Sequence, residues 1–427
     1  MTVVFVLFVV LLLTAMPAAF AIGIASIVFY MGDSPVPISI AVQKLASATQ
    51  SFPLLAIPFF IFAGNLMNRT GITPRLLTFS NVLTGWMTGG LAQVSILLST
   101  LMGGVSGSAV ADASMQSRIL GGDMLNRGYS KGFTAAVISY SAIITATIPP
   151  SLGLIVFGFV GGVSIGKLLL AGIIPGLLLM AVYMLITWRI AKKEGYAAER
   201  DSLPTGGEIW TSFLGCFWAL LFPVILLVGI RFGVFTPTES GAFCVVYALF
   251  VGIFVHKELD WKGFVQTVRD TVSDIGVVGL IIMTSAILGH VFVLDRLPQS
   301  ATEAIMGLTQ DPVMVMILIA ALMIVIGMLM EATVIILLLT PILLPIAISV
   351  GIDPVHFGLI FVLLVSLGGN TPPIGVCMFT VCGLLKVGTW EYFQASVPYI
   401  VGLLVLLAVM TVFPQIVMFL PNQFAGF

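Results

Sequence analysis

Apolar stretches of roughly 15 to 25 residues recur along the whole chain of 427 residues. A helix needs about 20 apolar residues to cross the hydrocarbon core of a bilayer. We therefore expect a polytopic α-helical membrane protein. Hydrophobic residues make up 59% of the chain and charged residues 8%, which excludes an ordinary soluble domain. The chain lacks the alternation in segments of about ten residues that is typical of outer-membrane barrels.

Two of the apolar stretches, 91–120 and 314–346, are interrupted at their middles by small or polar residues. We expect them to be re-entrant hairpins that return to the side from which they enter. A short amphipathic segment precedes each one, at 75–90 and 298–311. The expected membrane helices lie near 1–15, 17–32, 52–68, 132–160, 167–188, 209–231, 237–255, 275–294, 355–385 and 395–418.

The basic residues orient this arrangement. With both hairpins re-entrant, all but four of the 17 Lys and Arg residues fall on one face of the membrane. The positive-inside rule makes that face cytoplasmic and places both termini in the periplasm, as expected for a multi-pass protein of the bacterial inner membrane. The cytoplasmic set is Arg69, Arg75, Arg118, Arg127, Lys131, Arg189, Lys192, Lys193, Arg200, Lys257, Lys262, Arg269 and Lys386; the other four are Lys44, Lys167, Arg231 and Arg296.

Glycines and prolines recur in the two halves at a constant offset of 223 residues. Because these residues have special backbone roles, a repeat should keep them. Each half carries five crossings and one hairpin, and an odd number of crossings inserts the second half upside down. An inverted-topology repeat with broken helices is typical of secondary transporters. The matching pairs are Gly104 and Gly327, Gly128 and Gly351, Pro149 and Pro372, Pro150 and Pro373, and Pro175 and Pro398.

Each half has two places where the backbone should leave the helix at membrane depth. The segments are "GGVSGSA" and "TATIPPSLG" in the first half, and "GMLMEAT" and "GGNTPPIG" in the second. A double proline removes two N–H donors and disfavours helical geometry just before it, so upstream carbonyls lose their partners. Such groups are tolerated in lipid only where they line a cavity or bind a ligand. Free carbonyls and hydroxyls suit a hard cation, and half-helix N-termini suit an anionic substrate.

Acidic residues near the two hairpin tips are candidates for function, because charge inside a membrane is expensive. Asp112 either caps the second arm of hairpin 1 or contacts an ion or substrate directly. Glu331 is either a coupling-ion or proton site, or pairs with a cation on a partner. The full set of substrate-binding candidates is Gly107, Asp112, Pro149, Glu331, Pro372 and Pro373.

Two other functions fit parts of the same pattern. "GVSG" at 104–107 matches the G-x-S-G of an intramembrane serine protease, which needs a histidine base within hydrogen-bond reach. None of the three histidines, His256, His290 and His356, is well placed for it. An ion channel would need a continuous polar pore, whereas the polarity here gathers in two patches at the midplane. We therefore expect a transporter and no enzymatic activity.

The run "SFPLLAIPFFIFAGNLM" (51–67), followed by "GGVSGSAVADA", "IPPS" and "NTPPIG", resembles the large membrane subunit of tripartite ATP-independent periplasmic (TRAP) transporters. The resemblance covers essentially the whole chain. It implies sodium-driven import of a carboxylate, such as a C4-dicarboxylate or a sialic acid, by an elevator movement. It also implies two partners, a small four-helix membrane subunit on a separate chain and a soluble periplasmic substrate-binding protein.

The resemblance also assigns sites and domains. It implies Na⁺ as the coupling ion and no other cofactor. Sodium site 1 would use Ser106, Ser108, Thr145, Thr147 and Pro150, and sodium site 2 would use Gly327, Met330, Gly369, Asn370, Thr371 and Met378. The scaffold would comprise 1–74 and, with a cytoplasmic loop, 189–297. The transport domain would comprise 75–188 and 298–427, each with one arm, one hairpin and one broken helix. The scaffold helices near 1–32 and 209–255 should contact the small subunit.

Overall fold

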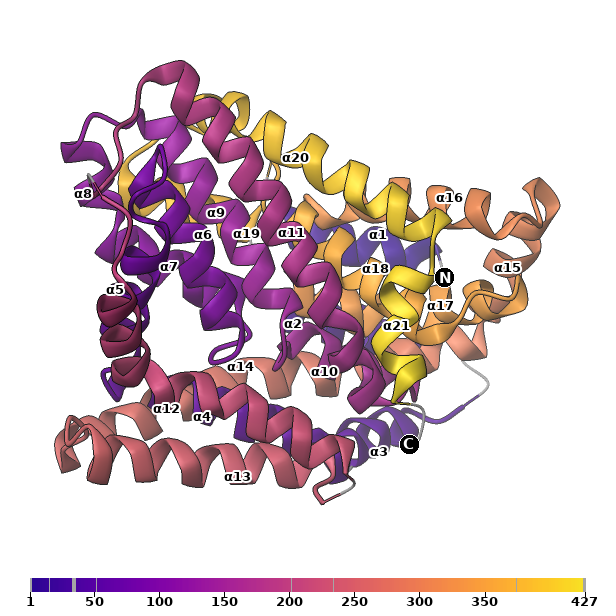
Figure 1. The fold of residues 1–427 in the computed structure, drawn as a ribbon. Helices are drawn as coiled ribbons and strands as arrows, with labels where there is room; N and C mark the ends of the chain where they lie inside the picture. The colour runs from indigo at the N-terminus through magenta and orange to yellow at the C-terminus, as the bar shows by residue number, and fades with distance from the viewer. Residues whose placement is uncertain are drawn as a thin grey trace.

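The computed structural model describes residues 2–14, 16–32, 36–50, 52–200, 202–232, 234–373 and 375–424. These residues form an all-α fold (Figure 1). Among them, six helices are long and apolar enough to cross a membrane, or seven if one bent pair counts as a single span. The chain ends, and Ser51 and Ile374 of the quoted motifs, lie outside the described residues.

The elements fall into two halves of the chain. The first half comprises α1 (Thr2–Leu13), α2 (Ala18–Met31), α3 (Ile38–Ala48), α4 (Ala56–Arg69), α5 (Ile72–Thr84), α6 (Gly90–Gly103), α7 (Ala109–Ile119), α8 (Gly121–Asn126), α9 (Lys131–Thr147), α10 (Leu152–Gly161) and α11 (Ile165–Glu194). The second comprises α12 (Gly206–Arg231), α13 (Pro237–Phe250), α14 (Trp261–Leu294), α15 (Leu297–Leu308), α16 (Pro312–Gly327), α17 (Ala332–Ser349), α18 (Pro354–Gly368), α19 (Val376–Leu385), α20 (Thr389–Val412) and α21 (Gln415–Gln423).

The predicted repeat is present in the order of the helices and in their contacts. Helices α5, α6, α7, α9, α10 and α11 correspond in order to α15, α16, α17, α18, α19 and α20. Hairpin 1 packs its helix α7 on α19 of the second half, and hairpin 2 packs α17 on α10 of the first half. The contact of α2 with α14 and that of α13 with α4 are reciprocal in the same way. Reciprocal pairing is the mark of a two-fold relation, as an inverted repeat requires.

Several helix boundaries differ from the sequence-based expectation. Helix α3 lies between the helices expected near 17–32 and 52–68, where no element was assigned, and it is an amphipathic helix of 11 residues. Helix α14 begins at Trp261 and runs for 34 residues rather than starting near 275. It starts there because Asp260 caps it, with its carboxylate accepting a hydrogen bond from the Gly263 N–H at 2.7 Å. Helices α1 and α2 have 12 and 14 residues, short of the roughly 20 that a crossing needs.

The helices pack in two groups. Helices α2, α3, α4, α13 and α14 contact one another, and α4, α13 and α14 lie together along the lower edge of Figure 1. Both hairpins pack instead around α9 and α18, whose side chains are almost all buried. The hairpins and the helix breaks therefore belong to the second group, at the centre of the molecule.

Candidate functional site

The tip of hairpin 1 is a short turn of small residues between α6 and α7. Gly107 there has a φ of 60°, which favours glycine because a side chain would strain the backbone. Its carbonyl accepts a hydrogen bond from the Leu152 N–H at 3.4 Å, and a Cβ at this position would overlap the Pro150 carbonyl. Ser108 then starts α7 as its N-cap, accepting from the Ala111 N–H at 3.4 Å. The tip thus lies directly against the first double proline.

The first double proline breaks the helix between α9 and α10, whose axes differ by 46°. The N–H groups at the new helix start are partly satisfied by Ser151, whose hydroxyl accepts from the Leu154 N–H at 3.3 Å. The same hydroxyl donates to the Ala146 carbonyl at the end of α9. Ser151 therefore connects the two half-helices across the break.

Hairpin 2 repeats this design with different residues. Glu331 is the N-cap of α17, and its carboxylate accepts from the Thr333 N–H at 2.8 Å and the Thr333 hydroxyl at 2.9 Å. At the end of α16, a Cβ added to Gly327 would lie 2.9 Å from the Gly368 Cα. The two glycines let hairpin 2 approach α18 where the second break begins.

The second break is held by hydrogen bonds from both halves of the chain. The Asn370 carbonyl accepts from the Tyr392 hydroxyl at 2.8 Å and the Tyr140 hydroxyl at 3.3 Å. The Asn370 amide donates to the Ser366 carbonyl at 2.8 Å, and its side-chain oxygen accepts from the Ser139 hydroxyl. The side chain and the carbonyl of Asn370 are thus all satisfied by protein groups.

The four segments meet at a cavity of about 120 Å³. Its walls include the first residues of four half-helices, α7, α10, α17 and α19. The capping side chains of three of them are Ser108, Ser151 and Glu331, whereas α19 starts at Gly375 without a side-chain cap. The partial positive charge at each helix N-terminus favours an anion in the cavity, whereas the Glu331 carboxylate in its lining opposes one. At the start of α19, the Gly369 carbonyl accepts hydrogen bonds from the Cys377 and Met378 N–H groups at 3.1 and 3.4 Å.

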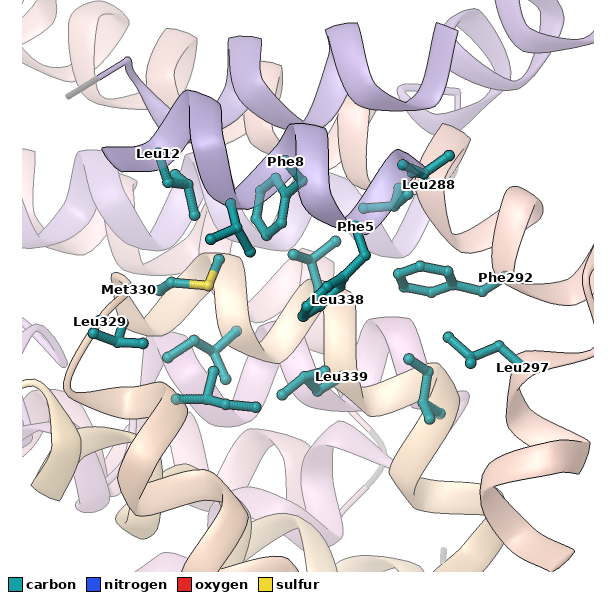
Figure 2. Close-up of a pocket in the computed structure, with 15 residues that line it drawn as sticks. Phe5, Phe8, Leu12, Leu288, Phe292, Leu297, Leu329, Met330, Leu338 and Leu339 are labelled. Carbon is teal, nitrogen blue, oxygen red and sulfur yellow. The ribbon is translucent and has the colours of Figure 1, made fainter. Parts of the chain in front are cut away.

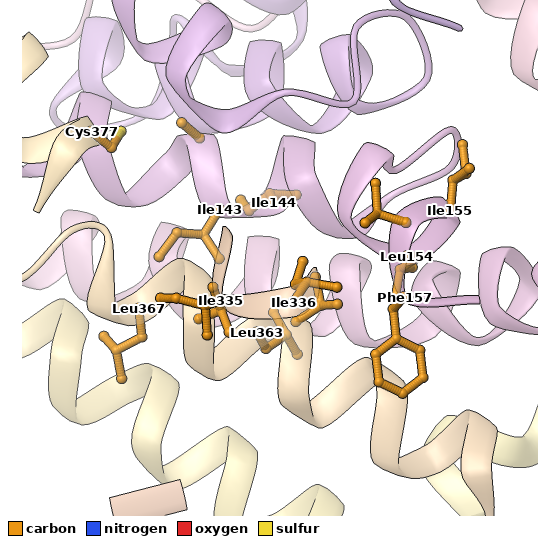
Figure 3. Close-up of a cluster of buried hydrophobic side chains, with 14 of the residues drawn as sticks. Ile143, Ile144, Leu154, Ile155, Phe157, Ile335, Ile336, Leu363, Leu367 and Cys377 are labelled. Atoms are coloured by element: carbon orange, nitrogen blue, oxygen red, sulfur yellow. The ribbon is translucent and has the colours of Figure 1, made fainter. Parts of the chain in front are cut away.

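Apolar side chains pack beside this cavity. Figure 3 shows buried residues of α9 and α10, such as Ile143 and Leu154, gathered with those of α17 and α18, such as Ile336 and Leu363. Gly153 and Ile336 line the cavity itself, and a Cβ on Gly153 would lie 3.5 Å from the Ile336 Cδ1. This packing encloses the helix starts in a low dielectric, which strengthens their electrostatic effect.

Asp112 lies in a buried polar cluster at the start of α7. One carboxylate oxygen accepts hydrogen bonds from Ser99 at 2.7 Å, Thr145 at 2.8 Å and Gln116 at 3.0 Å. The other carboxylate oxygen has no protein hydrogen-bond partner. The cap of α7 is Ser108, so Asp112 holds hairpin 1 to α9 through side chains. A buried acid with one unpaired oxygen is also the arrangement expected of a cation site.

The structure brings part of each predicted site together. The cavity is lined by Gly107, Ser108, Glu331, Gly369 and Asn370 among the predicted residues. Asp112, Pro149, Pro372 and Pro373 are outside its lining, as are Ser106, Thr145, Thr147, Pro150, Gly327, Met330, Thr371 and Met378.

Most predicted residues outside the lining are close to it in the chain. The Ser106 hydroxyl is buried without a protein partner. The Thr147 hydroxyl donates to the Ile143 carbonyl of its own helix at 2.7 Å, and the Thr371 hydroxyl, just past the end of α18, donates to the Leu367 carbonyl of α18 at 2.6 Å. Met330 faces a different cleft, between α1 and hairpin 2.

Some supporting residues had no signal in the sequence. Tyr140 and Tyr392 are aromatic residues in apolar helices, which is the usual appearance of core packing. The Tyr140 hydroxyl reaches Asn370 through the packing of α9 on α18, and the Tyr392 hydroxyl through the packing of α20 on α18. Ser151, by contrast, follows the double proline directly, and serine before a helical run is a readable N-cap signal.

The serine protease alternative finds no support in the geometry. The His256 ring is 2.7 Å from the Thr70 carbonyl, and burial lowers the pKa of this histidine below its usual value. The His290 ring pairs with the Tyr30 hydroxyl, and the His356 ring with the Met410 carbonyl at 2.9 Å. The Ser106 hydroxyl has no hydrogen-bond partner among the described residues, so none of these histidines acts on it as a base.

Comparison with known proteins gives a consistent result along nearly the whole chain. The family described as "Tripartite ATP-independent periplasmic transporter, DctM component" matches residues 5–416. The chain belongs to this TRAP transporter family. The resemblance seen in the sequence is thereby confirmed, and the chain is a transporter component rather than an enzyme.

TRAP relatives match over almost their full length. The sialic acid TRAP transporter large permease protein SiaM of Vibrio cholerae is 36% identical over 419 residues, covering 98% of this chain and 97% of SiaM. The C4-dicarboxylate TRAP transporter large permease protein DctM of Rhodobacter capsulatus is 32% identical over 435 residues, covering 98% of each. The crystal structure of the Alcanivorax borkumensis YdaH transporter, described as having an unusual topology, is similar with a TM-score of 0.60. It shares 14% identity and covers 88% of each chain, so this likeness concerns the fold alone.

Proposed function

We propose that this TRAP large permease imports an organic acid anion together with sodium ions. The observation that carries the proposal is the cavity where four half-helix N-termini meet. An anion there would be held by partial positive charges and backbone N–H groups, without an arginine or lysine in the lining. The substrates named for SiaM and DctM, a sialic acid and a C4-dicarboxylate, both carry carboxylates, which supports an acid as the substrate here.

Sodium is the proposed coupling ion because the surrounding groups are oxygens. Site 1 would gather hydroxyls and carbonyls near Ser106 and Thr145, and site 2 would gather carbonyls near Gly327 and Gly369. Each positive charge that moves inward gains about 2.3 kcal/mol per 100 mV of membrane potential. Two sodium ions with a monoanion would carry one net positive charge, whereas two with a dianion would be electroneutral.

The proposed movement is an elevator in which the hairpins and broken helices slide against a scaffold. Helices α2, α4, α13 and α14 make most of their contacts within their own group, which supports this division, although α14 also packs on α17 of hairpin 2. We also propose that a small membrane subunit binds the scaffold helices. A soluble binding protein would deliver the acid from the periplasm to the cavity.

The test is uptake of labelled acids into proteoliposomes that contain both membrane subunits. Purified binding proteins would be supplied outside, in sodium or in potassium buffer. We expect uptake only with sodium and with a matching binding protein. An imposed inside-negative potential should accelerate the uptake of a monoanion. Equal uptake in potassium buffer would contradict sodium coupling, and uptake of free acid without any binding protein would contradict the proposed delivery.

A further inference from the structure

A second cavity lies between α1 and hairpin 2, away from the polar cavity. Its volume is about 620 Å³, and we call it the apolar cleft. Figure 2 shows α1 along one side, with side chains of α14, α16 and α17 facing it. All the side chains that line it are apolar: Val4, Phe5, Phe8, Val9, Leu12, Leu288, Phe292, Leu297, Ile326, Leu329, Met330, Ile335, Leu338, Leu339 and Ile342.

Such a cleft is stable neither when filled with water nor when empty. Water needs two to four polar partners, and the lining supplies no polar side chain. An empty cleft would leave its walls without van der Waals contacts. Phe5 is 65% exposed and Leu329 51% exposed, so large apolar surface remains to be covered. In a protein that spans a membrane, the surrounding apolar medium is lipid hydrocarbon.

Two exposed residues of opposite charge, Asp295 and Arg296, come directly before one lining residue of the cleft in the sequence. Arg296 is the residue next to Leu297, which lines the cleft. A guanidinium group binds phosphate oxygens in a forked geometry. An apolar cleft with a guanidinium group next to a lining residue complements a phospholipid, which has apolar chains and an anionic phosphate.

We propose that the apolar cleft holds an acyl chain of a membrane phospholipid whose headgroup phosphate lies near Arg296. The chain contacts α1 and α14 on one side and hairpin 2, through α16 and α17, on the other. The bound lipid thus fills the space between the first helix and the hairpin whose tip carries Glu331.

Crosslinking to lipid tests the binding site. The full-length protein would be reconstituted with phosphatidylglycerol that carries a photoactivatable acyl chain, and adducts mapped by mass spectrometry. We expect adducts on peptides that cover 4–12 and 326–342. Leu339→Trp fills the cleft and should reduce these adducts several-fold. Val325→Trp is the matched control, because Val325 lies on α16 beside the lining residue Ile326 but is 60% exposed and outside the cleft.

Further variants distinguish a bound phospholipid from a protein occupant of the cleft. Leu12→Trp fills the cleft from the other wall, and serves if Leu339→Trp does not fold. Arg296→Gln should also reduce the adducts several-fold if the headgroup lies there. Equal adduct yields in the filled and control variants would overturn the proposal. Benzoylphenylalanine in place of Phe5 should add the mass of a phospholipid, whereas an adduct with the small subunit or with a second copy of this chain would show a protein occupant instead.

Discussion

Ser106 and Asn370 differ in how their polar groups are used, although the sequence assigns both to sodium sites. The Asn370 side chain and carbonyl are engaged by Ser139, Ser366, Tyr140 and Tyr392. The Ser106 hydroxyl is buried and has no protein partner. Because an unpaired buried hydroxyl costs free energy, a bound ion is a physical reason for its presence. Ser106 is therefore the better candidate for a direct sodium ligand. Asn370 is the better candidate for a residue that positions the helix break between α18 and α19.

We predict that Ser106→Ala weakens the apparent affinity for sodium roughly 10- to 100-fold, because a hydrogen bond or contact with a charge is worth about 1.5–3 kcal/mol. The measurement is a sodium titration of uptake in proteoliposomes. Ser117→Ala is the control, since Ser117 is also buried on α7 but its hydroxyl donates to the Ala113 carbonyl of its own helix at 2.7 Å. Identical sodium curves for Ser106→Ala and the wild type would remove Ser106 from the ion site.

Hairpin 2 and α18 approach each other through glycine at both contact points. Gly327 ends α16 and Gly368 ends α18, so the close approach falls where both helices stop. Hairpin 1 lies against its own helix break through Gly107 in the same way. Small residues at these crossings let backbones approach, which in lipid contributes much of the packing between helices.

We predict that Gly327→Ala lowers the free energy of unfolding by about 1–3 kcal/mol, as overpacking typically does. The added Cβ would lie 2.9 Å from the Gly368 Cα, so one of the two helices must shift. Thermal unfolding of the purified protein measures the effect. Gly383→Ala is the matched control, because a Cβ there meets no atom within 4 Å and alanine favours the helix. If both variants unfold at the same temperature, the contact is not tight.

The whole molecule has an orientation that the packing of its helices does not reveal. Its predicted direction rests on the positive-inside rule applied to the loops between helices. Lys193 lies at the exposed end of α11, and Gln310 lies in the exposed connection between α15 and α16. The predicted topology places these two positions on opposite sides of the membrane.

We predict that Gln310→Cys reacts with a membrane-impermeant maleimide in cells whose outer membrane is permeabilised, whereas Lys193→Cys reacts only after the inner membrane is opened. The four native cysteines are buried and should give little background. Labelling would be measured by gel shift. The reverse pattern would invert the topology and place both termini in the cytoplasm.

Much of this protein could be predicted from the sequence because the bilayer restricts a chain so strongly. Backbone polar groups must be satisfied inside lipid, so apolar runs become helices, and glycine and proline mark the places where they break. For this reason the all-α class, the repeat and the four breaks could be predicted from the sequence. "GGVSGSA" and the double prolines marked the positions of three of these breaks. The motifs also sufficed to recognise the family.

The tertiary structure decided which groups face the cavity and which support it. The Gly369 carbonyl accepts hydrogen bonds from the first N–H groups of α19, whereas serine or glutamate side chains cap the other three starts. Tyr140 reaches Asn370 because α9 packs on α18, a contact between residues about half the chain apart. Such contacts depend on how two distant helices meet, and the local sequence of either helix holds no information about the other.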